Sequence, residues 1–416
     1  MIGSVTLTSD LITWAFDVHI PLVYTVLGLL WTMPFVELKG LKSGNPEYFK
    51  LTRSMFNYMV VIYAIGGVFG TIITVFLAGL MPVFTNLAGF MLWPVWAAAI
   101  VAGVMITIPM IGLYYRTFER WSHKRHIALG LIIAVSATII PAMFRLVFAY
   151  TAYPYGTSVI PDPRSIIGFD LAVNVLTAFQ NPLYLPLLFA TVFAALAFTG
   201  IMMVFGYSVK SQSTYAPVGR SIGSRLVLVF GPLYAVAATW YMYEVYLFSP
   251  TIAWSLLGSP PPSLNPALYS VYRPVYILSW DPYAISVLAA VELVAVLYIS
   301  KKSNRFMAWV SAAAGIAMVD LAEGGNLLAH LPYAVVPPQS LALQLIQEYG
   351  AAFALNVAKT LQVSTLATVL DYLSIVINQV PILLVISIFL FLFFNVLVLG
   401  VIYMALQWRN PSGINE

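Results

Sequence analysis

The chain has 416 residues, of which 61% are hydrophobic and 8% are charged, and its formal net charge is +4. Soluble domains carry about 25% charged residues, so this composition excludes a sizeable soluble domain and indicates an integral membrane protein. The absence of cysteine excludes disulfides, iron–sulfur clusters and thiolate metal sites. The basic residues form no stripe that suits a phosphate backbone, so no nucleic-acid partner is expected.

Hydropathy predicts nine membrane-spanning helices in one all-α domain, residues 1–416. In chain order they cover residues 11–36, 54–80, 91–115, 126–151, 183–208, 225–248, 283–300, 306–330 and 380–406. The first residues, MIGSVTLTSD, lack the basic segment of a signal peptide, so the first span is predicted to stay in the lipid bilayer.

Lysine and arginine alternate between the two sides of this arrangement. The outer connections hold only Arg164, Arg273 and Lys359. The inner connections and the C-terminal end hold the other basic residues outside the spans: Lys39, Lys42, Lys50, Arg53, Arg116, Arg120, Lys124, Arg125, Lys210, Arg220, Arg225, Lys301, Lys302, Arg305 and Arg409. Because short basic loops stay in the cytoplasm, the N-terminus is predicted outside and the C-terminus inside.

Three outer connections are long. Residues 154–182 and 250–282 are rich in Pro, Tyr and Ser, which stiffen a chain without favouring a helix, so we predict external loops there. The connection 332–379 differs, because residues 340–370 read as helical. We predict that this external loop carries a helix at the outer membrane interface.

Most ionisable residues inside the spans fall at one level, in the outer third of the membrane, if each residue rises about 1.5 Å. They are Asp17, His19, Arg145, Glu244, Asp320, Glu323 and His330. Glu292 lies roughly 13 Å inside the seventh span, where a carboxylate must be protonated or paired. A charge in the middle of a membrane helix costs at least about 2.5 kcal/mol, so this polar layer is a candidate functional site.

Structural alternatives exist for each of these residues. His19 could ligate a metal or only bond between helices, and Asp17, two residues away, points to another helical face and is a poor partner for it. Arg145 could reach the interface or neutralise a carboxylate. Asp17 and Glu244 could be interfacial.

Two further pairs stand out by their spacing. Asp320 and Glu323 share a helical face and could bind a cation or share a proton. His123 and His126 belong to a basic inner loop, where we expect them to be solvated.

Several short motifs occur together in the first four spans. They are His19-Ile20-Pro21-Leu22-Val23, Tyr48-Phe49-Lys50-Leu51-Thr52-Arg53, Gly66-Gly67-Val68-Phe69-Gly70-Thr71 and Ile111-Gly112-Leu113-Tyr114-Tyr115. The glycine run allows the close approach of a helix or of a flat cofactor. In this combination the chain resembles subunit I, the large subunit, of cytochrome bd quinol oxidases.

The resemblance implies that His19 is an axial ligand of haem iron, of b or d type, near the outer face. Glu323, in Ala322-Glu323-Gly324, would be the counterpart of a glutamate that is a further haem site of the family. In that family, quinol bound at an external loop supplies electrons for oxygen reduction. The resemblance also implies a second membrane subunit and the plasma membrane of a prokaryote. Glu292 is a candidate for delivering protons.

The chain departs from the family at several positions. The third-span glutamates fall at about Ala99 and Thr107, the fifth-span histidine near Thr191 and the seventh-span methionine near Ser286. A hydroxyl offers no basic nitrogen to haem iron, so the low-spin haem would lack both ligands. A complete three-haem path is therefore not expected, and the number of haems stays open, down to none.

Three functions remain open on this reasoning. The first is a subunit I-like component of a bd-type quinol:oxygen oxidoreductase with a reduced haem set. The second is a redox-silent structural paralogue that docks a ligand-complete subunit. The third is a membrane transporter, although no repeat is evident and the charged layer lies off the midplane.

Overall fold

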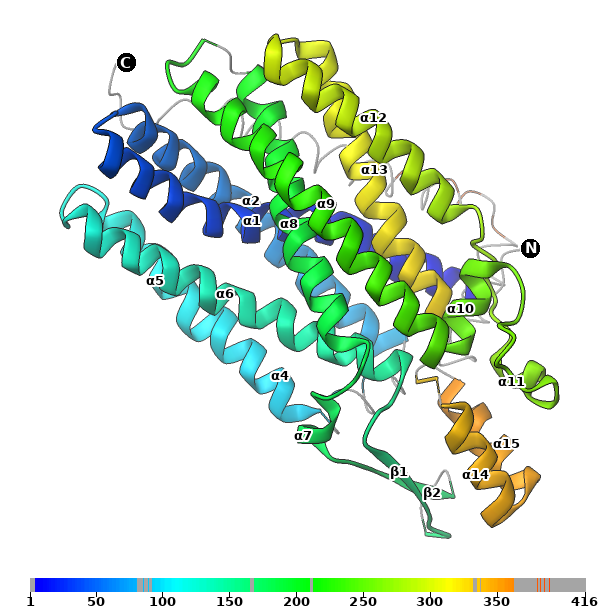
Figure 1. Cartoon of the computed structure of the whole chain (residues 1–416). Helices are drawn as coiled ribbons and strands as arrows, with labels where there is room; N and C mark the ends of the chain where they lie inside the picture. Colours follow the sequence, from blue (N-terminus) through cyan, green and yellow to red (C-terminus); the bar gives the residue numbers. More distant parts are fainter. Residues whose placement is uncertain are drawn as a thin grey trace.

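The computed structural model of the chain describes residues 4–80, 92–164, 168–209, 212–331 and 338–362, with a few isolated positions beside them. Long helices run side by side from one end of this part to the other (Figure 1). Eight of the described helical segments are long and apolar enough to cross a membrane. The predicted all-α membrane fold is confirmed, and the ninth predicted span, 380–406, lies almost wholly outside the described residues.

The helix bounds follow the hydropathy prediction closely. The helices are α1 (Ser4–Ser43), α2 (Glu47–Leu80), α6 (His123–Ala152), α8 (Tyr184–Val209), α9 (Ala216–Phe248), α12 (Asp281–Lys301) and α13 (Arg305–His330). The third span is divided into α4 (Trp93–Ile100), a π-helix η1 (Val101–Thr107) and α5 (Ile108–Thr117). Several helices begin before or end after the predicted apolar stretch, because hydropathy detects only the part inside the hydrocarbon.

Local signals in the sequence stop and start these helices. After α1, Gly44 adopts a left-handed conformation with φ of 69°, and its N–H bonds the carbonyl of Gly40 at 2.9 Å. Glycine is favoured in this role because it has no Cβ. Asn304 caps α13 by accepting a hydrogen bond from the backbone N–H of Met307 at 3.1 Å. These tight connections place sequential helices beside each other in opposite directions.

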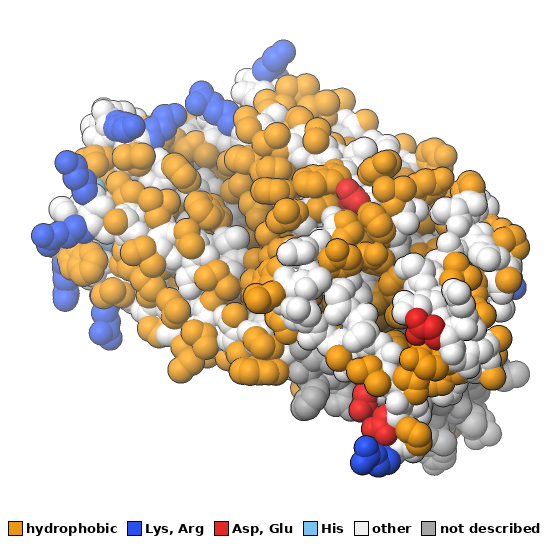
Figure 2. Space-filling model, turned by 60° about the horizontal axis from the view of Figure 1, so that its bottom comes forward, with side chains coloured by type: hydrophobic (Ala, Val, Ile, Leu, Met, Phe, Trp, Pro, Cys, Tyr) orange, Lys and Arg blue, Asp and Glu red, His pale blue; other side chains and the backbone are white. Residues whose placement is uncertain are grey.

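The two ends of the bundle differ in charge. The connections α1–α2, α5–α6, α8–α9 and α12–α13 lie at one end, and the N-terminus lies at the other (Figure 1). Lys and Arg side chains gather at one end of the molecule, and a broad hydrophobic band separates them from the other end (Figure 2). This arrangement agrees with the predicted orientation, in which the basic end faces the cytoplasm.

The outer end is more structured than predicted. Strands β1 (Thr157–Pro161) and β2 (Phe169–Val173) form an antiparallel hairpin within the predicted loop 154–182. Strands this short give little periodicity to read in a sequence. The other outer elements are α7 (Val175–Ala178), α10 (Pro250–Leu257), η2 (Pro266–Leu268) and α11 (Tyr269–Tyr272). Within the predicted helical stretch 340–370, the described residues up to 362 form α14 (Gln339–Tyr349) and α15 (Ala351–Gln362), which meet at Gly350 with φ of 87°; residues 363–370 lie outside the described part of the chain.

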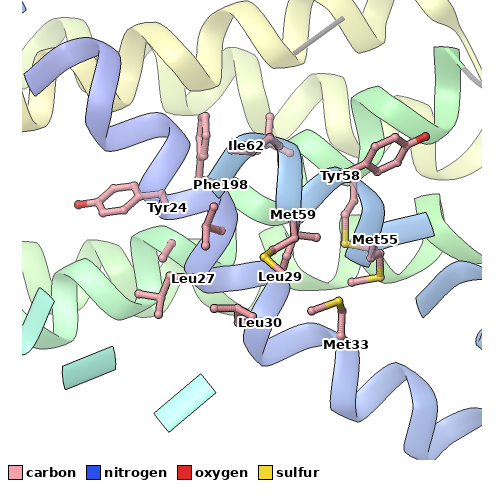
Figure 3. Close-up of a cluster of buried hydrophobic side chains, with 14 of the residues drawn as sticks. Tyr24, Leu27, Leu29, Leu30, Met33, Met55, Tyr58, Met59, Ile62 and Phe198 are labelled. Atoms are coloured by element: carbon pink, nitrogen blue, oxygen red, sulfur yellow. The ribbon is translucent and has the colours of Figure 1, made fainter. Parts of the chain in front are cut away.

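Helix α1 lies at the centre of the bundle, where it contacts α2, α6, α8 and α13. Buried side chains of α1, such as Leu29 and Met33, interdigitate with Met59 of α2 and Phe198 of α8 (Figure 3). Helices α1 and α8 come close together at Gly28, where a Cβ would lie 2.5 Å from the carbonyl oxygen of Ala195. The central position of α1 brings its polar residues into the middle of the protein.

Candidate functional site

His19 faces α2 and not the lipid. Its Nδ1 lies 2.9 Å from the carbonyl oxygen of Gly66, and a Cβ on Gly70 would lie 3.0 Å from its Cε1. A carbonyl only accepts hydrogen bonds, so Nδ1 carries the proton and Nε2 keeps its lone pair. The His19 ring therefore lies against the glycine run of α2, and we call its contacts with Gly66 and Gly70 the His19 seat.

Asp17 faces the opposite neighbour, α13, as the helical spacing predicts. A Cβ on Gly324 would lie 2.5 Å from Asp17 Oδ1, so only glycine leaves room for this carboxylate. Asp17 Oδ1 and Asp320 Oδ1 are buried and accept no hydrogen bond from the described residues. Asp17 interacts electrostatically with Asp320 and Glu323.

A buried ion pair joins three helices beside these carboxylates. Arg145 on α6 donates from Nη2 to Glu323 Oε1 on α13 at 2.6 Å and to the Tyr24 hydroxyl on α1 at 3.0 Å. Tyr24 also donates a hydrogen bond to Glu323 Oε1. Arg145 is only 6% exposed. Of the two alternatives for Arg145, the structure shows neutralisation of a carboxylate.

A small cavity adjoins this ion pair on the outer side. It has a volume of about 40 Å³, and its polar lining comes from Arg145, Glu323, His330, Asn326 and Tyr241. Tyr241 donates to the side-chain oxygen of Asn326 at 3.1 Å. Asn326 and His330 lie on the same side of α13 as Glu323, one and two turns further out, so periodicity could have grouped them.

Two members of the predicted polar layer lie apart from the ion pair. Glu244 is half-buried on α9 and accepts a hydrogen bond from Trp240 Nε1 at 3.0 Å on its own helix. Glu292 is 3% exposed between α12 and α13, where Ser311 donates to its Oε1 at 2.7 Å. Its Oε2 is buried without a hydrogen bond from the described residues.

The two histidines at the cytoplasmic end, His123 and His126, were predicted to be solvated, and this holds for only one of them. His126 is 1% exposed, and its Nδ1 lies 2.7 Å from Oε2 of the equally buried Glu37. Only His123 remains partly solvated, with its Nδ1 3.1 Å from Glu37 Oε1. The expectation of a solvated His126 was wrong, because its partner is 89 residues away in sequence and no local pattern reveals it.

The positions at which the sequence resemblance predicts that family ligands are missing hold neutral side chains. Thr191 is buried and donates to its own helix at Leu187, and Ser286 is exposed and donates to Pro282. Thr107 is fully buried and donates to Ser136 Oγ at 3.1 Å. None of these three hydroxyls can supply a nitrogen or sulfur ligand to iron.

By the chemistry of its donor atoms, His19 is suited to be a metal-ligating imidazole. A neutral imidazole anchored through one nitrogen by a carbonyl is the usual state of a metal-ligating histidine, and His19 has this arrangement. Glu323 accepts hydrogen bonds from Arg145 and Tyr24 on Oε1. Its other carboxylate oxygen, Oε2, takes part in neither bond and has the chemistry of a metal ligand. Thr191 and Ser286 do not fit a haem held by two axial ligands. The described residues contain no group of three or more His, Cys, Asp or Glu arranged for a metal ion.

Comparisons with known proteins agree with the fold described above. The family model described as cytochrome bd terminal oxidase subunit I matches residues 11–253, which is more than half of the chain. A chain of the bd oxidase from Geobacillus thermodenitrificans has the same fold, with a TM-score of 0.72 at 16% sequence identity over 99% of this chain and 100% of that chain. No curated protein sequence gives a significant match.

Proposed function

Because the chain belongs to the cytochrome bd terminal oxidase subunit I family, we propose that it acts as a haem-bearing subunit of a bd-type quinol:oxygen oxidoreductase. It is a multi-pass membrane protein, and we propose the prokaryotic plasma membrane as its location. The observation that carries the proposal is the contact of His19 with α2, where Nδ1 lies 2.9 Å from the Gly66 carbonyl oxygen, so that the lone pair of the neutral ring is on Nε2.

We propose a reduced haem set, with one haem at His19 and at most a second at Glu323. A haem supplies one-electron and oxygen chemistry when it is bound. The chain's own residues fix its surroundings: the Gly66 carbonyl sets the tautomer of His19, and Arg145 and Tyr24 hold Glu323 Oε1 in place. Glu292, buried between α12 and α13 with one oxygen unbonded, is the proposed proton-delivering carboxylate.

The lack of ligands for the low-spin haem has a consequence for the second subunit of the complex. Thr191 and Ser286 cannot hold the low-spin haem, so electrons from quinol need another route to the His19 level. We propose that a second membrane subunit of the complex carries the haem that receives them.

Optical spectra of imidazole variants test the proposal. The whole chain has four histidines, and we propose comparing His19→Ala, His330→Ala and His123→Ala in the purified complex by reduced-minus-oxidised spectra and haem extraction. We expect His19→Ala to lose one haem per complex, while His123→Ala at the cytoplasmic end keeps the full set. Loss in His330→Ala alone would move the ligand to the cavity beside Glu323, and full retention in His19→Ala would overturn the assignment.

A redox-silent structural role is the second candidate, and a specific observation favours it. The cavity beside Glu323 measures about 40 Å³, and Glu323 is already neutralised by Arg145. A chain that had lost its cofactors would keep such an internal ion pair. In that case all haem in the complex would reside on the partner subunit, and none of the three histidine variants would change the haem content.

A further inference from the structure

At the cytoplasmic end of the bundle, one buried carboxylate joins three helices. Glu37 of α1 is 1% exposed. It lies against Tyr114 of α5 and against His123 and His126 of α6, and we call these four residues the Glu37 cluster. The cluster is separate from the His19 seat, since Glu37 lies 18 residues further along α1, a distance of about 27 Å.

The two ring nitrogens of His126 both face acceptors. Nε2 lies 3.1 Å from the carbonyl oxygen of Tyr114, and because a carbonyl only accepts, Nε2 carries a proton. Nδ1 lies 2.7 Å from Glu37 Oε2, where two lone pairs would repel, so a second proton lies between the ring and the carboxyl group. Imidazole is the stronger base of the two, so this proton is on nitrogen. The pair is then an imidazolium and a carboxylate with no net charge.

The surroundings of this pair favour its second proton. Glu37 and His126 are each 1% exposed, so an unbalanced charge on either residue is costly. The rings of Tyr114 and His126 lie against each other with their centroids 3.8 Å apart, and an aromatic face attracts a cation. Arg53 of α2 and Glu119 of the α5–α6 connection form an ion pair with each other, so their charges cancel. The proton on His126 is therefore what balances the carboxylate of Glu37.

His123 is the surface member of the cluster. Its side chain is 42% exposed, its ring stacks on Phe49 of α2, and its Nδ1 lies 3.1 Å from Glu37 Oε1. Glu37 thus bridges an exposed imidazole and a buried one. On the other side of His126, the Tyr114 carbonyl accepts a hydrogen bond but has no proton to pass on. The cluster therefore takes a proton from the cytoplasmic side and does not conduct it further into the membrane.

We propose that Glu37 and His126 form a binding site for one proton from the cytoplasm, and that the bound proton holds α1 against α5 and α6. When this proton leaves to cytoplasmic water, the Nδ1 lone pair of His126 faces the Glu37 carboxylate, and the buried site carries a negative charge. The packing of this end is therefore tightest at low pH and weakens as the cytoplasmic pH rises. The site goes beyond the proposed function and is independent of a haem on this chain.

Nitrogen NMR of the histidine-labelled complex tests the proton count. The chain has four histidines, and the signals that disappear in His126→Gln identify His126. At about pH 8, above the value of about 6.5 at which a free histidine loses its proton, we expect both nitrogens of His126 to be protonated. Glu37→Gln should leave one protonated nitrogen, because no carboxylate balances the second proton. Glu119→Gln, the matched control at a side chain that is 69% exposed, should keep both. One protonated nitrogen in the wild type, or two in Glu37→Gln, would overturn the proposal.

Hydrogen–deuterium exchange of the complex tests the effect of the proton on packing. After correction for the intrinsic pH dependence of exchange, we expect the backbone amides of residues 118–130 to lose protection severalfold as the pH rises. Glu37→Gln should show the weaker protection at every pH, whereas Glu119→Gln should keep the pH dependence. Protection that does not change with pH in the wild type would overturn the role of the proton in holding α1 against α5 and α6. A complex without haem at His19 would defeat the proposed function and leave this site standing.

Discussion

At the scale of single residues, the position of the His19 ring depends on two glycines of α2. Gly66 supplies the carbonyl that holds Nδ1, and Gly70 leaves the space in which the ring lies. The sequence shows the glycine run but not its partner, since helix packing explains such runs equally well. The opposite orientations of His19 and Asp17, in contrast, follow from helical periodicity alone.

Gly70→Val tests this seat. A branched side chain would start from a Cβ only 3.0 Å from His19 Cε1, so the ring must move away from α2. We expect the haem band of the complex to shift or disappear while the protein still assembles. Gly67→Val is the matched control, because nothing lies within 4 Å of a Cβ at that position. Equal spectra for Gly70→Val and the wild type would contradict the assigned seat.

Arg145→Met tests the buried ion pair. Removal of the cation leaves Glu323 charged with only the Tyr24 hydroxyl as a partner, and breaking a buried ion pair in this way costs about 3–5 kcal/mol. We expect a lower free energy of unfolding in denaturant titrations of the detergent-solubilised protein. The double variant Arg145→Met/Glu323→Gln should recover most of the loss, because no charge is stranded. If the double variant were as unstable as the single one, the pair would not be the source of the stability.

Glu292→Gln tests the proposed proton-delivering carboxylate. The amide keeps the size and the hydrogen bond with Ser311 but cannot carry a proton. We expect quinol oxidation by the complex to fall by at least about tenfold, with an unchanged haem spectrum. Ser311→Ala, which keeps the carboxylate, should retain most of the activity. Full activity in Glu292→Gln would remove this residue from the proton route.

At the scale of elements, the positions of the membrane spans in the sequence were largely predictable. Which helix faces pack against each other was not. Lipid imposes apolar runs of a fixed length, so hydropathy located the described spans within a few residues at most ends. The ion pair of Tyr24, Arg145 and Glu323 depends on which faces of α1, α6 and α13 meet, and no local pattern encodes this. The β1–β2 hairpin was missed for a different reason, because strands of five residues lack a readable period.

Gly28→Leu tests the central contact of α1 with α8. A Cβ at this position would lie 2.1 Å from Thr199 Oγ1 and 2.5 Å from the backbone oxygen of Ala195, and a backbone atom cannot move aside. We expect a loss of at least about 1–3 kcal/mol, the usual cost of overpacking a core, and a lower thermal unfolding temperature. Gly231→Leu on α9, where a Cβ meets nothing within 4 Å, should have little effect. Wild-type stability of Gly28→Leu would contradict the close approach.

At the scale of the whole molecule, charge and polar chemistry are separated between the two ends. Basic side chains gather at one end of the molecule (Figure 2). The polar layer around Asp17, His19 and Glu323 belongs to the N-terminal part of α1 and the C-terminal part of α13, toward the opposite end. A reaction centre near the outer face needs protons from the other side if it is to generate a membrane potential. Composition and loop charge alone were enough to predict this polarity.

The most direct measurement of the central claim is chemical rescue of His19→Gly in the purified complex. We expect this variant to lose one haem and its absorbance, and added imidazole to restore both by occupying the space against Gly70, near the Gly66 carbonyl. Retention of the complete haem complement in His19→Gly without imidazole would contradict the claim that this histidine holds a haem.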